Sequence, residues 1–104
     1  MMFTYKAVVL NVVDGDTIDV RVDLGFRIFT TQRIRLSRID TPERGQNGFA
    51  EARDFLIDLI EGKTITLRTH NVSKWGHFLG DVILDGQDIN QLLLEKNLAR
   101  PWVG

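Results

Sequence analysis

The run Arg33-Ile34-Arg35-Leu36-Ser37-Arg38-Ile39-Asp40-Thr41-Pro42-Glu43 joins two kinds of local structure. Its apolar and polar residues alternate with a period of two, which predicts a strand with the aliphatic stem of Arg38 on the apolar side. Pro42 ends the strand, because proline has no N–H for a ladder and favours extended geometry in the residue before it. The run therefore predicts a strand that leads into a rigid turn carrying the carboxyl groups of Asp40 and Glu43.

The residues before this run predict two further strands. Residues 3–13 are rich in branched apolar side chains, and residues 17–24 alternate strictly between apolar and polar side chains. Asp14-Gly15-Asp16 separates them, and Asp-Gly between apolar runs is a strong hairpin signal. Gly25 predicts the next turn, so that residues 26–39 form a long third strand. Three consecutive strands joined by short turns favour a curved meander that closes towards a barrel.

The residues after the run alternate between helical and strand patterns. Apolar residues recur at helical spacing over 49–61, and strand patterns follow over 63–69 and 78–84. Asp88 is placed to cap a final helix over 89–98. Three strands, a helix, two strands and a helix are the arrangement of an OB-fold. We therefore predict a mainly β, α+β protein: one domain over 1–104, with a five-stranded OB-fold barrel and two helices.

Composition limits the kinds of function. The 104 residues contain no cysteine and two histidines, which excludes thiolate sites and a zinc site of the usual kind, so a metal here would be a hard cation held by oxygen. A net charge of −1 argues against non-specific coating of nucleic acid, although it permits a local phosphate site. No apolar run approaches the roughly 20 residues that span a membrane, and residues 1–6 lack a signal-peptide pattern. We therefore expect a cytoplasmic protein without a membrane partner. A bacterial or phage origin agrees with this sequence.

Carboxylates stand at two separated strand ends, at Asp14 and Asp16 and again at Asp40. Carboxylates brought together from two strand ends are a normal way to bind calcium or magnesium. The alternative for the first pair is turn chemistry, since aspartate bonds its own backbone in turns. Glu43 is either a general base that takes a proton from water or a solvated turn residue. An arginine fork beside carboxylates suits a phosphate that also meets a metal ion.

The order of three motifs resembles the staphylococcal-nuclease-like (thermonuclease) family. The motifs are Val-Val-Asp-Gly-Asp-Thr at 12–17, Arg-Ile-Arg-Leu-Ser-Arg-Ile-Asp-Thr-Pro-Glu at 33–43, and Lys-Trp-Gly-His-Phe-Leu-Gly at 74–80. The resemblance extends to the closing runs at 89–93 and 97–99, so it covers nearly the whole chain. It implies hydrolysis of phosphodiester bonds in DNA and RNA with little sequence preference, with nucleic acid as the substrate and Ca²⁺ as the cofactor.

The resemblance also implies roles for individual residues. Asp16 and Asp40 would bind one calcium ion, to which Thr41 would add its backbone carbonyl. Glu43 would be the base for the attacking water, and Arg35 would bind the scissile phosphate. These roles are physically coherent, because a metal polarises a phosphoryl oxygen while a guanidinium group meets the charge that develops in the transition state.

One motif departs from the family. The run Ser73-Lys74-Trp75-Gly76-His77 stands where the family has Asp-Lys-Tyr-Gly-Arg, so His77 replaces the arginine that serves as second phosphate clamp. A neutral imidazole offers one donor and no charge, and losing one such donor typically costs on the order of 3 kcal/mol in the transition state. His77 is then either a weakened clamp or a surface histidine. Lys74 is a phosphate contact or a solvated charge, and Trp75 and Trp102 are base-stacking or packing residues, with packing favoured for Trp102.

The leading hypothesis is therefore a calcium-dependent nuclease in which Arg35, Glu43 and His77 are catalytic. The alternative is a non-catalytic OB-fold module that binds single-stranded nucleic acid or nucleotides, which the departure at His77 favours. A protein-interaction module is a third interpretation, opposed by the intact carboxylates. The sequence does not define the preference between DNA and RNA, the physiological metal or the oligomeric state.

Overall fold

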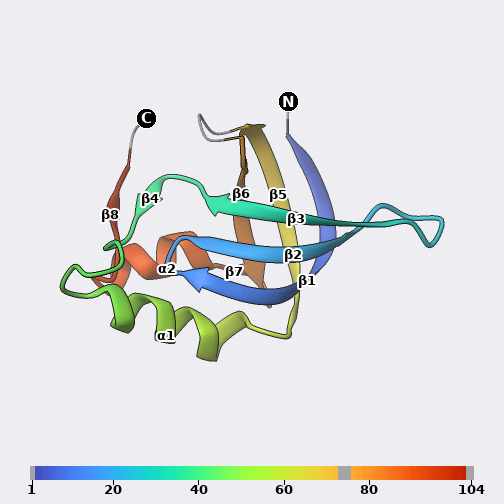
Figure 1. Cartoon of the computed structure of the whole chain (residues 1–104). Helices are drawn as coiled ribbons and strands as arrows, with labels where there is room; N and C mark the ends of the chain where they lie inside the picture. The colour runs from blue at the N-terminus through green and yellow to red at the C-terminus, as the bar shows by residue number, and fades with distance from the viewer. Residues whose placement is uncertain (1, 73–75, 103–104) are drawn as a thin grey trace.

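The computed structural model describes residues 2–72 and 76–102. Within them a closed barrel is built from the five longest strands: β1 (Phe3–Asp14), β2 (Thr17–Asp23), β3 (Phe29–Leu36), β5 (Thr64–Val72) and β6 (Phe78–Leu84). Neighbouring strands follow the order β3-β2-β1-β5-β6, and a parallel pairing of β3 with β6 closes the sheet (Figure 1). The predicted OB-like α+β fold is confirmed.

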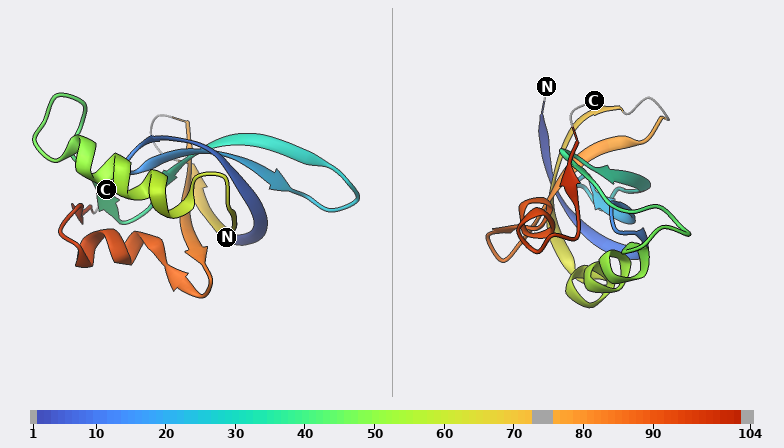
Figure 2. Two further views of the ribbon diagram at one scale, coloured as in Figure 1. Left: turned by 90° about the horizontal axis from the view of Figure 1, so that it is seen from below. Right: turned by 90° about the vertical axis from the view of Figure 1, so that its left-hand side faces the viewer.

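Two helices lie at one end of the barrel, while the β2–β3 hairpin extends away at the other (Figures 1 and 2). The helices are α1 (Phe49–Ile60) and α2 (Ile89–Glu95), and Asp88 caps α2 as predicted, accepting the Gln91 N–H at 3.1 Å. Three strands of two residues complete the described chain: β4 (Ile39–Asp40), β7 (Gln87–Asp88) and β8 (Arg100–Pro101). No helix in the described part of the chain combines the length and the apolar character that crossing a membrane requires.

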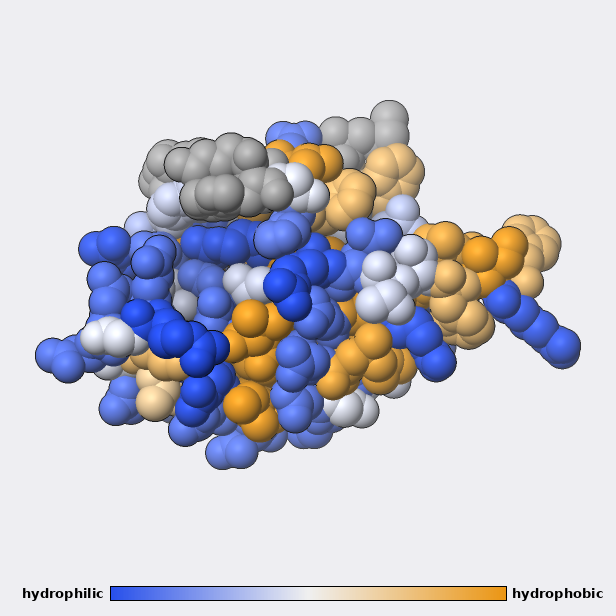
Figure 3. All heavy atoms as spheres, viewed as in Figure 1, coloured by the Kyte–Doolittle hydropathy of each residue, from blue (hydrophilic) through white to orange (hydrophobic). Residues whose placement is uncertain are grey.

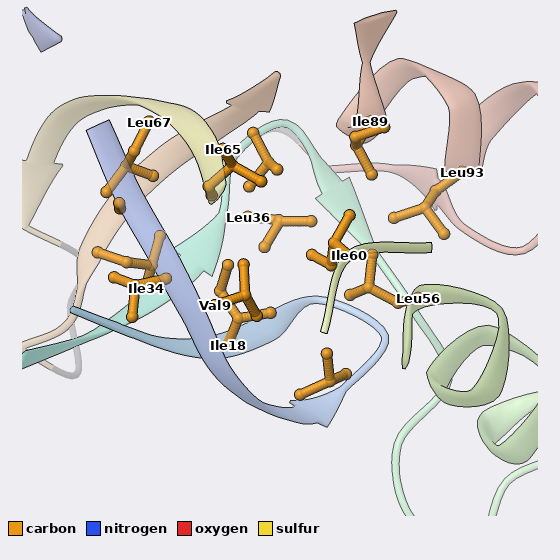
Figure 4. Close-up of a cluster of buried hydrophobic side chains, with 14 of the residues drawn as sticks. Val9, Ile18, Ile34, Leu36, Leu56, Ile60, Ile65, Leu67, Ile89 and Leu93 are labelled. Carbon is orange, nitrogen blue, oxygen red and sulfur yellow. The ribbon is translucent and has the colours of Figure 1, made fainter. Parts of the chain in front are cut away.

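The core fills the barrel and its junction with the helices (Figure 4). The predicted inner face of β2 is confirmed, with fully or almost fully buried residues alternating with polar ones along the strand. Burial of a large aliphatic side chain stabilises a fold by roughly 1.5–3 kcal/mol, so this cluster holds the strand ends of the barrel in place. Its largest fully buried members include Ile18, Ile34, Leu36, Leu56, Ile60, Leu67, Ile89 and Leu93.

The third strand is shorter at its start than the predicted 26–39. Phe26 and Arg27 have φ of 55° and 60°, which no strand residue adopts, and the Ile28 N–H donates to the Gly25 carbonyl at 2.9 Å to close the turn. The Phe26 side chain is 97% exposed, and Figure 3 shows apolar side chains over this protruding hairpin. Residues 24–28 are therefore the end of a hairpin.

The same strand also ends earlier than predicted, at Leu36. The Ser37 N–H donates to the Gly80 carbonyl at 2.9 Å, and Arg38 turns the chain with φ of 70° before β4 begins. The expectation that the Arg38 stem lies on the apolar side is wrong, because the side chain points out and pairs with Asp88 at 2.9 Å. This turn lets Asp40 leave the barrel wall and reach β8.

Two other predicted boundaries differ. The final helix ends at Glu95 and not at residue 98, because Asn97 adopts φ of 58° and the Leu98 N–H bonds back to the Leu93 carbonyl at 3.0 Å. The fourth long strand, β5, continues to Val72, beyond the predicted end at residue 69. Asn90 was not predicted to be buried, yet it is fully enclosed and donates to the carbonyls of Ser37 and Gly80.

Candidate active site

The Asp14-Gly15-Asp16 turn is packed tightly against the loop that follows β4. The Asp16 N–H donates to Oδ1 of Asp14 at 3.1 Å, the aspartate turn that the sequence suggested. A Cβ on Gly15 would lie 2.9 Å from Oγ1 of Thr41 and 2.8 Å from Cβ of Ala52 in α1. Only glycine therefore lets this turn approach Thr41 and the helix so closely.

Backbone and side-chain hydrogen bonds join the two acidic motifs. The Leu36 N–H donates to the Asp16 carbonyl at 2.7 Å, and the Thr41 N–H donates to Oδ2 of Asp16 at 3.0 Å. The Thr17 hydroxyl donates to the other carboxylate oxygen, Oδ1, at 3.1 Å. Asp16 is 7% exposed, so its carboxylate is held in one orientation beside the start of the 41–48 loop.

Arg35 is the central cation of this site. Its side chain is 11% exposed, and its Nη2 lies 3.3 Å from Oδ2 of Asp16 and 3.4 Å from Oδ1 of Asp40. Its Nη1 donates to the carbonyls of Leu36 and Ile39 at 2.8 and 2.9 Å. The guanidinium group is thus fixed by four contacts, and the two carboxylates converge on one of its nitrogen atoms.

A cleft of about 550 Å³ opens over these side chains. Glu43 lines it from the 41–48 loop and is exposed, while its backbone N–H donates to Oε1 of Gln46 at 2.7 Å. His77 lines the cleft from the segment before β6. The structure therefore brings Asp16, Arg35, Asp40, Thr41, Glu43 and His77 to one cleft. The suggested substrate-binding residues Lys74 and Trp75 lie outside the described residues.

Asp14 and Asp16 impose an electrostatic cost on each other. Burial raises the pKa of Asp14 to about 6, and the neighbouring Asp16 carboxyl adds to the increase. Both effects disfavour a second negative charge in this turn. A cation bound nearby would therefore favour the ionised form of Asp14.

The oxygen atoms of the site fit a hard divalent cation. Asp16 and Asp40 supply two carboxylates, and Oγ1 of Thr41 is buried without a hydrogen-bond partner in the described part of the chain. Among the described residues no three acidic or histidine side chains converge as a ready-made metal cluster. A cation at this place would therefore take two carboxylates and complete its shell with backbone oxygen and water, which calcium and magnesium accept.

Two residues of this region were not identified as site residues from the sequence. The centroid of the Trp102 ring lies 5.3 Å from Cζ of Arg35, and the ring lines the cleft. Trp102 therefore stacks on a catalytic candidate, whereas we had favoured packing in the core. Arg100 binds Oδ2 of Asp40 through Nη2 at 3.0 Å. The aromatic and basic composition of residues 100–102 was the available signal, but its partners lie 60 or more residues earlier.

Comparisons with known proteins identify the family of this chain. The chain matches the family model described as "Staphylococcal nuclease homologue" over residues 33–103. A protein named "Uncharacterized endonuclease" from Escherichia coli is 36% identical over 96 residues, which cover 91% of this chain and 58% of that protein. The "Micrococcal nuclease" of Shigella flexneri is 32% identical over 104 residues, covering 91% of this chain and 57% of its own length.

The fold and the site define a staphylococcal-nuclease-like OB-fold protein. The chain belongs to the staphylococcal nuclease family. It spans less than two thirds of the length of either of these relatives.

Proposed function

We propose that this chain is a calcium-dependent nuclease that hydrolyses phosphodiester bonds in DNA and RNA with little sequence preference. The observation that carries the proposal is the position of Arg35, whose Nη2 lies between the carboxylates of Asp16 and Asp40 at 3.3 and 3.4 Å in an open cleft. A fixed guanidinium group beside a pair of converging carboxylates is suited to a phosphate that also contacts a cation.

Asp16, Asp40 and the carbonyl of Thr41 would hold the calcium ion. When bound, the ion would supply Lewis-acid polarisation of a phosphoryl oxygen. Arg35 would bind the scissile phosphate and stabilise the negative charge that grows on its oxygens in the transition state. Its four existing contacts leave little freedom to reorganise, so this stabilisation would be available when the bond begins to break.

Glu43 would act as the general base. Its side chain is exposed on the wall of the cleft that Arg35 also lines, where water can reach it. The water oxygen forms a bond to phosphorus as Glu43 takes a water proton, and the bond from phosphorus to the leaving oxygen breaks. His77 would be a weaker second clamp, since a neutral imidazole offers one donor in place of a charged fork.

The test is cleavage of labelled single-stranded DNA with calcium against excess chelator. We expect calcium-dependent cutting by the natural chain and loss of cutting in Glu43→Gln, which keeps the side-chain size and removes the base. The matched control is Glu51→Gln, because Glu51 is an exposed carboxylate in the first turn of α1. DNA binding without cutting would overturn the nuclease activity and favour the non-catalytic binding module.

A further inference from the structure

A second hollow lies beside the catalytic cleft. It has a volume of about 510 Å³, and it is formed between the 41–48 loop and the segment that joins α2 to β8. The hollow and the cleft share three wall residues, Asp40, Thr41 and Pro42. A ligand that extends past Asp40 from the cleft would therefore enter this second hollow.

The lining of the second hollow is polar and rich in amides. Gln46 and Asn47 contribute from the loop, and Asn97 contributes from the turn after α2. Amide side chains carry both hydrogen-bond donors and acceptors, which is the mixture that the edge of a nucleobase presents. Asp40 is the one carboxylate among the described residues that line the hollow. This lining therefore suits a polar ligand better than an apolar one.

Arg100 provides the positive charge of the second hollow. The pairing of β4 with β8 sets it directly opposite Asp40, and its Nε and Nη2 lie 3.1 and 3.0 Å from Oδ2 of Asp40. The other oxygen of the same carboxylate faces Arg35. Two guanidinium groups thus flank one carboxylate, one towards each hollow, an arrangement suited to adjacent phosphates of one strand.

The pairing of Arg100 with Asp40 leaves Arg100 available to a ligand. Its side chain is 81% exposed, and an ion pair in contact with water is weak because solvent screens it. Arg35, by contrast, has a side chain that is only 11% exposed and is held by four contacts. Arg100 can therefore exchange a carboxylate for a phosphate at small cost, whereas Arg35 stays in place.

We propose that the second hollow binds the nucleotide adjacent to the scissile phosphate of a single strand. Arg100 contacts the phosphate of that nucleotide, and the amides of Gln46, Asn47 and Asn97 contact its base. The volume of the hollow lies within the range of roughly 300–1,000 Å³ that is usual for small-ligand sites. The inference rests on the proposed function only in that the cleft must take a nucleic acid strand.

The test is the binding of a fluorescent single-stranded DNA trinucleotide, measured against salt concentration in excess chelator, so that calcium-dependent cutting does not interfere. We expect Arg100→Met to weaken binding about tenfold, equivalent to about 1.4 kcal/mol. It should also reduce the slope of log affinity against log salt by about 0.7, the loss of one single-strand phosphate contact. Arg100→Lys should keep the slope, because it keeps the charge.

Two further variants make the result specific. Asn47→Asp places a negative charge in the exposed lining of the hollow and should also weaken binding, since it repels the phosphate. Arg68→Met removes an exposed arginine from β5, outside both hollows, and should change neither the affinity nor the slope. An Arg100→Met variant that loses affinity at an unchanged slope would overturn the proposal, because Arg100 would then act only by holding Asp40.

The outcomes separate this inference from the nuclease proposal. Affinity and slope in Arg100→Met equal to those in Arg68→Met, with calcium-dependent cutting intact, would overturn the second subsite alone. The expected changes in a chain that cuts nothing with calcium would support the subsite and overturn the nuclease activity. No trinucleotide binding by the natural chain would overturn the subsite, whose contacts do not need calcium, and the cutting assay with calcium would still decide the nuclease activity.

Discussion

The backbone N–H of Thr41 donates a 3.0 Å hydrogen bond to Oδ2 of Asp16, and this bond joins two motifs that lie 25 residues apart in the chain. The bond is buried, and the oxygen that accepts it also lies 3.3 Å from Nη2 of Arg35. The position of the loop that carries Glu43 is thus tied to the turn that carries Asp16. A shift of Asp16 at the candidate metal position would therefore also move Glu43, the candidate base.

Asp40→Asn should weaken calcium binding by about tenfold or more while the fold persists. The substitution removes one of two converging carboxylates, and charge count strongly sets calcium affinity. Asp40 is partly exposed, and its two partners keep other contacts, since Arg100 is solvated and Arg35 is hydrogen-bonded to backbone carbonyls. The free energy of unfolding should therefore change little. Calorimetry with calcium, with Asp54→Asn as the control on α1, measures the effect. Unchanged calcium affinity would remove Asp40 from the site.

His77→Arg should raise nuclease activity at neutral pH by about tenfold or more. A guanidinium group in the cleft would add a charged fork for the transition state, where the imidazole supplies at most one neutral donor. The rate of cleavage of single-stranded DNA under saturating calcium is the measurement, and His77→Gln is the control that keeps a neutral polar side chain. Equal rates for the natural chain and His77→Arg would mean that the second clamp lies elsewhere.

Asp81 should make the fold sensitive to acid. Burial opposes its ionisation, but hydrogen bonds from Ser37 and His70 and the charge of Arg38 outweigh burial and hold the pKa of Asp81 below its usual value. His70 lies 2.8 Å from Oδ2, and Arg38 also pairs with Asp88. Because the pKa is lower in the folded chain, the ionised carboxylate stabilises the fold above its unfolded pKa, near about 4. That contribution is lost as the pH falls through the folded value.

The variant Asp81→Asn measures this contribution. At pH 6–7 it should reduce the free energy of unfolding by about 1.5–3 kcal/mol, the range for hydrogen bonds to a charged group. The difference from the natural chain should shrink below about pH 4, as the natural carboxyl becomes protonated. Urea unfolding between pH 3 and about pH 7 tests this, with Asp58→Asn on the exposed face of α1 as control. A difference that stays constant with pH would contradict the assigned role.

The end of the β2–β3 hairpin should be easy to stabilise. Phe26 and Arg27 occupy the left-handed region of backbone conformation. Placing a residue other than glycine or asparagine there typically costs roughly 1–2 kcal/mol. The double substitution Phe26→Asn and Arg27→Gly supplies the pair that such turns prefer and should increase the free energy of unfolding by about 1 kcal/mol. Denaturant unfolding measures it. A lower midpoint would show that the exposed Phe26 side chain stabilises the folded chain.

The barrel was predictable because its signals are local. Alternation along residues 17–24, the Asp-Gly pair at Gly15 and the cap at Asp88 each depend on neighbours within a few residues, and each is present in the structure. The boundaries that were wrong depend on distant partners. Arg38 turns out of the strand because Ser37 bonds to Gly80, a contact that spans 43 residues.

The candidate site, like the barrel, was predicted in part from the sequence. The residue types of the site could be read from the sequence: carboxylates at two strand ends, the alternating strand that presents Arg35, and a histidine at position 77 where the family has arginine. The contact of Trp102 with Arg35 and that of Arg100 with Asp40 could not be predicted, because the pairing of β4 with β8 joins segments 60 residues apart. Hydrophobic periodicity specifies which face of a segment is buried, whereas the closing of the barrel determines which exposed side chains meet.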